Sequence, residues 1–152
     1  TYTNPLTYVT PQGVEETITL PELYKKTTYT VLYFYPKDNT PGCTIEARDF
    51  STLSKDFSKV DAQIIWVSKD SVKSHCGFQT KQELSLGLIA DTSTELAQYF
   101  WAWGEKKFMG RKYMGTFRNT YLLDNTWAIL YKRENVSAVW HAKEVLAYIQ
   151  SL

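Results

Sequence analysis

Two short apolar segments on either side of a helical pattern constrain most strongly how this chain can fold. Residues 29–35 and 62–68 are rich in β-branched and aromatic side chains, which favours strands buried inside a sheet. Between them, residues 41–57 carry apolar or small side chains at helical spacing, and Pro41 suits the first turn of a helix. This order of elements predicts an α/β fold with helices packed on a central sheet.

The rest of the chain predicts how that sheet is extended and covered. Residues 6–10 and 14–20 predict an N-terminal hairpin, because Pro11-Gln12-Gly13 between them is a turn signal. The alternation of strands and helices predicts a mixed sheet with helices on both faces. The other expected elements are a helix at 71–84 capped by Asp70 or Ser71, a strand at 86–90, a helix at 93–100, a loop at 101–115, a hairpin of 116–123 with 127–132, and a helix at 143–151.

Length and composition exclude several classes of protein. A chain of 152 residues is expected to form one domain, residues 1–152. Its 17 Lys and Arg residues nearly balance its 16 Asp and Glu residues, so we expect neither a nucleic-acid partner nor a membrane partner. Apolar runs reach only about five residues, far fewer than the roughly 18 that span a bilayer. Two cysteines without zinc spacing indicate functional thiols in a reducing cytoplasm, and no metal.

Cys43 is the side chain with the greatest predicted reactivity. It follows the strand at 29–35 and lies at the expected N-terminus of the next helix, where unpaired N–H groups and the helix dipole favour a thiolate. That position supplies about 0.3–2 kcal/mol, whereas lowering a thiol pKa from about 8.5 to about 6 requires roughly 3.4 kcal/mol. A hydroxyl from Thr40 and a cation such as an arginine would have to supply the difference. Without such partners, a lone cysteine here is more often a small core residue.

Several motifs resemble one family of thiol proteins. Pro36-Lys-Asp-Asn-Thr40-Pro-Gly-Cys43 is similar to the Pro-x-x-x-Thr-x-x-Cys signature of the peroxiredoxins. Residues 103–115 and 117–124 resemble the loop and the active-site strand of the bacterioferritin co-migratory, or Q-type, group, and residues 67–75 and 140–146 also match that group. The resemblance covers nearly the whole chain in the same order. It implies a thioredoxin-like fold with an N-terminal β-hairpin addition.

The resemblance also implies a function and a set of site residues. Cys43 would be the peroxidatic cysteine, whose thiolate attacks hydrogen peroxide or an organic hydroperoxide and becomes a sulfenic acid. Arg118 would hold the thiolate and the peroxide oxygens, and Thr40 would donate a hydrogen bond to them. Pro36 would shield the pocket from water, and Glu46, on the same helical face as Cys43, would help to orient the arginine. No metal or organic cofactor would be required.

The chain departs from the Q-type pattern at the resolving cysteine. Many members carry that cysteine five residues after the first, where this chain has Arg48. Cys76, in the next expected helix, is therefore either the resolving cysteine or a half-buried apolar thiol. A Cys43–Cys76 disulfide would require Cα atoms within about 7 Å and local unwinding, which Gly77 would make easier. The implied reductant is thioredoxin or a similar dithiol protein, acting on a monomer or a weak homodimer.

Other functions remain open on the sequence alone. A one-cysteine peroxidase would use an external thiol, and a redox sensor would use Cys43 oxidation to change a partner surface. A thiol–disulfide oxidoreductase is disfavoured because Glu46 stands where Cys-x-x-Cys has its second cysteine. The aromatic residues of segment 101–115 are consistent either with loop packing or with a pocket mouth that favours organic peroxides; they are Trp101, Trp103, Phe108 and Tyr113.

Overall fold

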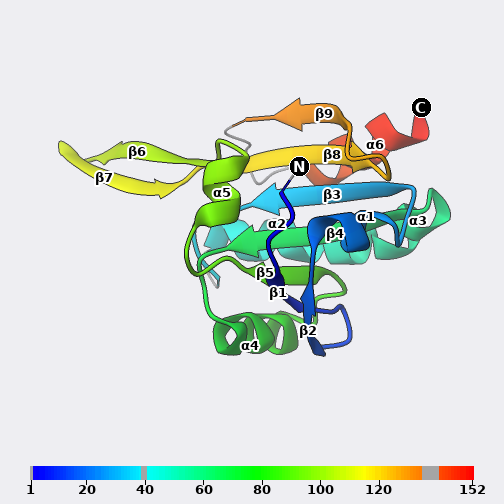
Figure 1. The fold of residues 1–152 in the computed structure, drawn as a ribbon, viewed down its shortest axis with the longest axis horizontal. Helices are drawn as coiled ribbons and strands as arrows, with labels where there is room; N and C mark the ends of the chain where they lie inside the picture. The colour runs from blue at the N-terminus through cyan, green and yellow to red at the C-terminus, as the bar shows by residue number, and fades with distance from the viewer. Residues whose placement is uncertain (1, 39–40, 135–140) are drawn as a thin grey trace.

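The computed structural model describes residues 2–38, 41–134 and 141–152, and a mixed β-sheet of seven strands forms its centre (Figure 1). A separate two-stranded hairpin projects from one end of this sheet. In chain order the elements are β1 (Leu6–Val9), β2 (Glu15–Ile18), α1 (Leu20–Tyr24), β3 (Tyr29–Phe34), α2 (Pro41–Thr52), α3 (Ser54–Lys59), β4 (Ala62–Ser68), α4 (Val72–Gln82), β5 (Gly87–Ala90), α5 (Glu95–Tyr99), β6 (Trp103–Phe108), β7 (Arg111–Thr116), β8 (Asn119–Asp124), β9 (Ile129–Arg133) and α6 (His141–Gln150).

The strand order confirms the mixed sheet expected from the sequence. The order across the sheet is β2-β1-β5-β4-β3-β8-β9. Strands β3, β4 and β5 run parallel to one another, whereas β8 and β9 add antiparallel neighbours on one side and β1 and β2 add them on the other. Strand β3 therefore lies between β4 and β8, and the end of β3 that leads to α2 lies beside the start of β8.

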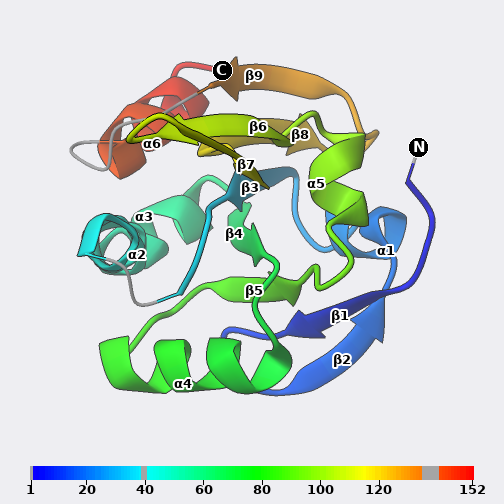
Figure 2. The same cartoon turned by 90° about the vertical axis from the view of Figure 1, so that its left-hand side faces the viewer.

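Two apolar layers cover the two faces of the sheet. Val31 and Tyr33 of β3, with Tyr35 directly after the strand, pack with α2, α3, α4 and α6, whereas Leu32 and Phe34 pack with α1 and α5. Side chains alternate between the faces of a strand, so one strand contributes to both layers. Figure 2 shows α2, α3 and α6 on one side of β3 and β4, with α1 and α5 on the other. Helices on both faces, as predicted, are confirmed.

Two expectations for the N-terminal half need correction. The helix expected over residues 41–57 is interrupted at Leu53, which separates α2 from α3. Hydroxyl residues flank this break, and they have weak helix propensity because their side chains compete for backbone hydrogen bonds. The strand expected to reach Leu20 ends at Ile18, because Thr19 and Glu22 form a capping box that starts helix α1.

The prediction of a loop at residues 101–115 is also wrong, because this segment forms the hairpin β6–β7. Polar or charged residues occupy both faces of the hairpin, so the segment lacks the apolar and polar alternation of a half-buried strand. Its turn is Met109-Gly110 instead of a common turn pair such as Asn-Gly. Neither usual hairpin signal is therefore present in the sequence. Within the residues that the structure describes, no helix is long and apolar enough to cross a membrane.

Candidate functional site

Sheet topology brings Arg118 close to Cys43, although 75 residues separate them in the chain. Cys43 lies in the first turn of α2, and its side chain is fully buried. Arg118 directly precedes β8, whose first residue pairs with Phe34 at the end of β3. Burial acts to lower the pKa of Arg118, but the negative charge of Cys43, followed by Tyr33 and Glu46, raises that pKa above its ordinary value. The thiol and the guanidinium are therefore electrostatic partners.

Tyr33 links Glu46 to this arginine. Glu46 follows Cys43 by one helical turn and is fully buried, and its Oε2 accepts a 2.7 Å hydrogen bond from the Tyr33 hydroxyl. Tyr33 also lies close enough to Arg118 to raise the pKa of the guanidinium. Buried Nη1 of Arg118 has no hydrogen-bond partner among the described residues, so the donor capacity of this group is unused within them. Tyr33 is not among the site residues expected from the sequence, although a tyrosine on the inner face of a buried strand requires a partner for its hydroxyl.

Burial keeps Glu46 and its neighbour His141 neutral near pH 7. It raises the pKa of Glu46 to about 8, although Tyr33 and the charge of Arg118 act in the opposite direction. Burial lowers the pKa of His141 to about 4. The 3.9 Å approach of His141 Nε2 to Glu46 Oε1 is therefore a contact between neutral groups and not an ion pair. His141 Nε2 shares a 2.6 Å hydrogen bond with Thr120 Oγ1.

Glu46→Gln is expected to make protein stability less sensitive to pH. An unfolded chain releases the Glu46 proton above about pH 4.5, whereas the folded protein retains it up to about pH 8. The stabilisation from the neutral carboxyl is therefore complete below pH 4.5 and is lost as the pH rises through 8. The amide of the variant stays neutral at every pH. From pH 4.5 to pH 8, we therefore expect the unfolding free energy of the natural protein to fall by roughly 4 kcal/mol more than that of the variant. Urea unfolding at both pH values measures this difference.

A matched control for this experiment is Glu15→Gln, which changes an exposed carboxylate on β2. It should alter the unfolding free energy by no more than about 0.5 kcal/mol at either pH. The unfolding free energies of the Glu46→Gln variant and the natural protein could instead fall equally between pH 4.5 and pH 8. Glu46 would then ionise as in the unfolded chain, and a pKa raised by burial would be refuted.

Lys106 is a second cation near Cys43 that the sequence analysis missed. Its Nζ donates a 3.0 Å hydrogen bond to the backbone carbonyl of Thr116 at the base of the hairpin. Burial and the charge of Arg118 lower the pKa of Lys106, whereas the charge of Cys43 raises it. The sequence does not distinguish Lys106 from Lys107, since only the pairing of β6 with β7 determines which lysine lies on the half-buried face.

Cys76 lies on α4 and packs against the same apolar layer that contains Cys43. It is half-buried, whereas Cys43 is fully buried. Both side chains are thiols in the structure. The next residue, Gly77, is exposed, and a Cβ added there would meet no atom within 4 Å. No packing constraint therefore requires a glycine in the middle of this helix.

A buried polar network ties α4 to the segment that leads from β3 to Cys43. His75 is fully buried, with Nδ1 2.9 Å from Asp38 Oδ2 and Nε2 2.9 Å from the carbonyl oxygen of Ile89. Asp38 also accepts hydrogen bonds from the Tyr35 hydroxyl and, at 2.8 Å, from Ser74 Oγ. Removing one member of such a network leaves the others buried and unsatisfied. The start of α4 is therefore firmly anchored beside the site.

Pro36 and Thr40 are the other two predicted site residues. Pro36 lies just beyond the end of β3 and is half-buried. Thr40 lies outside the described residues. Among the residues with described positions, no group of three or more His, Cys, Asp or Glu side chains could hold a metal ion.

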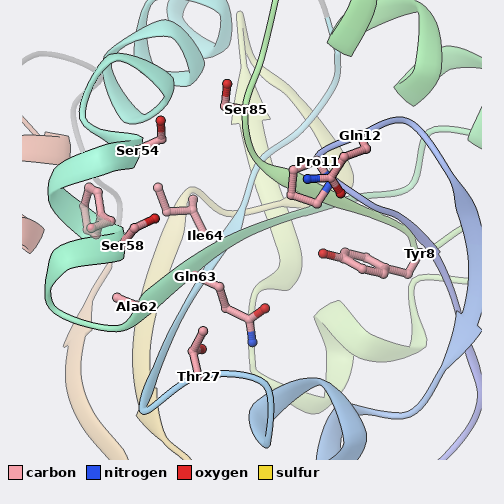
Figure 3. A pocket seen from close by; sticks show the side chains of 11 residues that line it. Tyr8, Pro11, Gln12, Thr27, Ser54, Ser58, Ala62, Gln63, Ile64 and Ser85 are labelled. Carbon is pink, nitrogen blue, oxygen red and sulfur yellow. The ribbon is translucent and has the colours of Figure 1, made fainter.

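A pocket elsewhere in the molecule does not coincide with these residues (Figure 3). It has a volume of about 340 Å³ and lies between α3, β4 and the turn that joins β1 to β2. Its lining includes Tyr8, Gln12, Ser54 and Gln63, and none of the lining residues is charged or is a cysteine or histidine. The pocket therefore offers neither a thiol nor a charged group for catalysis.

Comparisons with known proteins show which sequences and structures this chain is similar to. Residues 6–132 match the AhpC/TSA family. Peroxiredoxin Bcp of Bacillus subtilis is 40% identical over 137 residues, which cover 90% of this chain and 86% of that protein. A structure of Xanthomonas campestris peroxiredoxin Q, a cysteine-to-serine mutant, superposes with a TM-score of 0.88 at 35% identity and covers 97% of this chain and 90% of that one. This similarity confirms the expected thioredoxin-like fold.

Another similar structure comes from a protein whose reaction is described. It is the bacterioferritin comigratory protein of Xanthomonas campestris, described in complexes with a trapped intermediate and ligand that concern its alkyl peroxide reduction activity. Its TM-score is 0.85 at 35% identity, over 97% of this chain and 90% of that one.

Proposed function

Because the chain belongs to the AhpC/TSA family and is a peroxiredoxin, a thiol-dependent peroxidase, we propose that Cys43 is its peroxidatic cysteine. The observation that carries this proposal is the electrostatic pairing of buried Cys43 with Arg118. A guanidinium beside a thiol stabilises the thiolate, which is the nucleophilic form. The Nη1 group of Arg118 without a partner among the described residues supports a second role, as a donor to a peroxide oxygen.

In the proposed reaction, the Cys43 thiolate attacks one oxygen of the peroxide. A sulfur–oxygen bond forms as the oxygen–oxygen bond breaks, and the other oxygen takes up a proton and leaves as water or an alcohol. Sulfur is oxidised to a sulfenic acid while the peroxide is reduced. Arg118 and Lys106 would stabilise the negative charge that develops on the leaving oxygen, and Tyr33 with Glu46 would hold the guanidinium in position. Thr40 and Pro36 are proposed in the roles that the family signature implies.

We further propose that Cys76 resolves the sulfenic acid. Its thiol would attack the sulfur of oxidised Cys43, so that a disulfide forms and water leaves. Both cysteines contact one apolar layer, which supports this route. Because hydrogen bonds of His75 anchor the start of α4, the required movement would come from α2 and from the part of α4 that contains exposed Gly77.

Peptide mapping tests both cysteines in one experiment. After one equivalent of hydrogen peroxide, we expect a linked Cys43–Cys76 peptide in the natural protein. The Cys76→Ser variant should instead retain a sulfenic acid on Cys43, which a dimedone-type reagent would trap. A stable sulfenic acid with unmodified Cys76 in the natural protein would refute the two-cysteine route and favour the one-cysteine peroxidase.

Gly77→Ala tests whether α4 must open. Alanine stabilises a helix interior by about 1 kcal/mol relative to glycine, and here it meets no neighbouring atom within 4 Å. We therefore expect the disulfide to form up to about fivefold more slowly, while the first oxidation of Cys43 keeps its rate. An unchanged rate of disulfide formation would show that α4 stays folded in this step.

The reductant, compartment and assembly are proposed on more general grounds. We propose thioredoxin or a similar dithiol protein as the reductant of the Cys43–Cys76 disulfide, since two successive thiol–disulfide exchanges would restore both thiols. A reducing, cytoplasmic environment is proposed because two cysteines in 152 residues are too few for a disulfide scaffold. A monomer or weak homodimer is proposed, and sedimentation velocity over a range of protein concentrations would distinguish them.

A further inference from the structure

The hairpin β6–β7 projects from one end of the central sheet, and its tip lies away from the rest of the protein (Figure 1). Its strands pair with each other from Trp103 opposite Thr116 to Phe108 opposite Arg111, and they form a sheet separate from the seven-stranded one. At the tip, the exposed fraction is 66% for Phe108 and 89% for Met109. These side chains therefore make little contribution to the apolar core.

The backbone at the tip is unfavourable for the residue that occupies it. Met109 has a φ of 50° and Gly110 a φ of 78°, so both turn residues lie in the left-handed region. Asparagine or glycine is the usual residue in the first of these positions, because the Cβ of other residues is crowded there. Since Met109 is almost fully exposed, burial within this chain does not offset the strain. Departures from local rules of this kind concentrate at functional sites.

Basic side chains surround the tip on both faces of the hairpin. Lys107 lies directly opposite Lys112, and Arg111 lies opposite Phe108. Side chains alternate along each strand, so the two lysines are on one face and the arginine is on the other. Like charges placed opposite each other destabilise a hairpin, and the ion pair of Lys112 with Glu105, at 3.9 Å and largely exposed, offsets this only weakly. The tip therefore concentrates positive charge with little internal compensation.

We propose that this tip docks on a bilayer surface that contains anionic phospholipid. Phe108 and Met109 enter the head-group region, and Lys107, Arg111 and Lys112 contact lipid phosphates. A bilayer accepts a convex apolar end and supplies negative charge around it on every side. The net charge of +1 for the whole chain hides this local concentration, which explains why composition gave no indication of a membrane partner.

Vesicle flotation with the full-length protein tests the proposal. Phosphatidylcholine vesicles with phosphatidylglycerol should bind the protein, and pure phosphatidylcholine vesicles should not. Added salt should release it. Each cation near an anionic surface strengthens binding about fivefold, so a variant with Lys107, Arg111 and Lys112 all changed to serine should bind roughly 100-fold more weakly. A control with Lys25, Lys55 and Lys73 changed to serine has the same net charge, and these exposed residues lie away from the hairpin.

Met109→Asn separates docking from folding. Asparagine suits the left-handed turn position, so the thermal midpoint should stay the same or rise. Vesicle binding should nevertheless fall about fivefold, because an apolar group no longer enters the interface. All of these variants should consume hydrogen peroxide at the natural rate, since none of the changed residues belongs to the Cys43 site.

The proposal would be overturned if the natural protein failed to bind the phosphatidylglycerol vesicles, or if both triple variants weakened binding equally. It would also be overturned if the tip variants slowed only the reduction by a dithiol protein, which would make the tip a protein docking site. Peroxide reduction is a separate measurement. If it failed in the natural protein, the proposed function would be refuted while the vesicle result would stand.

Discussion

Cys43→Ser is expected to abolish peroxide reduction while leaving the fold intact. A serine hydroxyl is not ionised near neutral pH and is a poor nucleophile towards oxygen, so the second-order rate constant with hydrogen peroxide should fall at least about 1000-fold. Serine is nearly the size of cysteine and occupies a fully buried position, so the loss of stability should stay within about 1–2 kcal/mol. Stopped-flow peroxide consumption and thermal unfolding measure the two effects.

Cys76→Ser is the matched control, because it removes the other thiol of the chain. It should leave the first turnover with hydrogen peroxide unchanged and slow only the turnovers that require reduction. Peroxide consumption that survives in Cys43→Ser but is lost in Cys76→Ser would reverse the assignment of the two cysteines.

Substitution of Arg118 is expected to have the next largest effect. Arg118→Met keeps much of the side-chain length but removes the charge and every N–H donor, so the rate constant with hydrogen peroxide should fall about 100- to 1000-fold. Loss of a charged hydrogen bond worth about 1.5–3 kcal/mol should also raise the pH midpoint of Cys43 thiolate formation by about 1–2 pH units. Arg118→Lys retains the charge without the planar set of donors, and we expect an intermediate loss of about 10- to 100-fold.

Thiolate absorbance as a function of pH separates an electrostatic role of Arg118 from a purely structural one. If Arg118 acts through its charge and its donors, the pH midpoint should rise from the natural protein to Arg118→Lys and again to Arg118→Met. Variants that merely loosened the fold would lower activity without producing this order. Arg48→Met is a matched control, because Arg48 is an exposed cation on the same helix as Cys43. If Arg48→Met and Arg118→Met reduced the rate equally, a specific role for Arg118 would be excluded.

The sequence predicted the central elements of the fold because burial there leaves a clear pattern. Segments 29–35 and 62–68 are apolar along most of their length since both of their faces are covered, and the structure confirms both strands. Hairpin β6–β7 was missed for the opposite reason. Solvent reaches both of its faces, so no alternation marks its strands, and its turn uses Met109 where asparagine is usual.

In the candidate site, too, some features follow from the local sequence and others depend on how the strands pair. The signature around Cys43 is local, so the sequence by itself predicts a nucleophile there and its need for a cation. The structure confirms the expected position of Cys43 in the first turn of a helix. The resemblance supplied Arg118 as that cation, but only the pairing of β3 with β8 brings Arg118 to the end of the strand that leads to Cys43.

Contacts between distant segments depend on tertiary structure alone. Tyr33 meets Glu46 and Arg118 because β3 lies beneath α2 and beside β8, and Lys106 approaches the site because its hairpin folds back at Met109-Gly110. The pKa of Glu46, raised by burial to about 8, follows from the same packing. A sequence specifies which groups can ionise or donate, whereas their depth and neighbours, which determine charge and reactivity, arise only when the strands pair and the helices cover them.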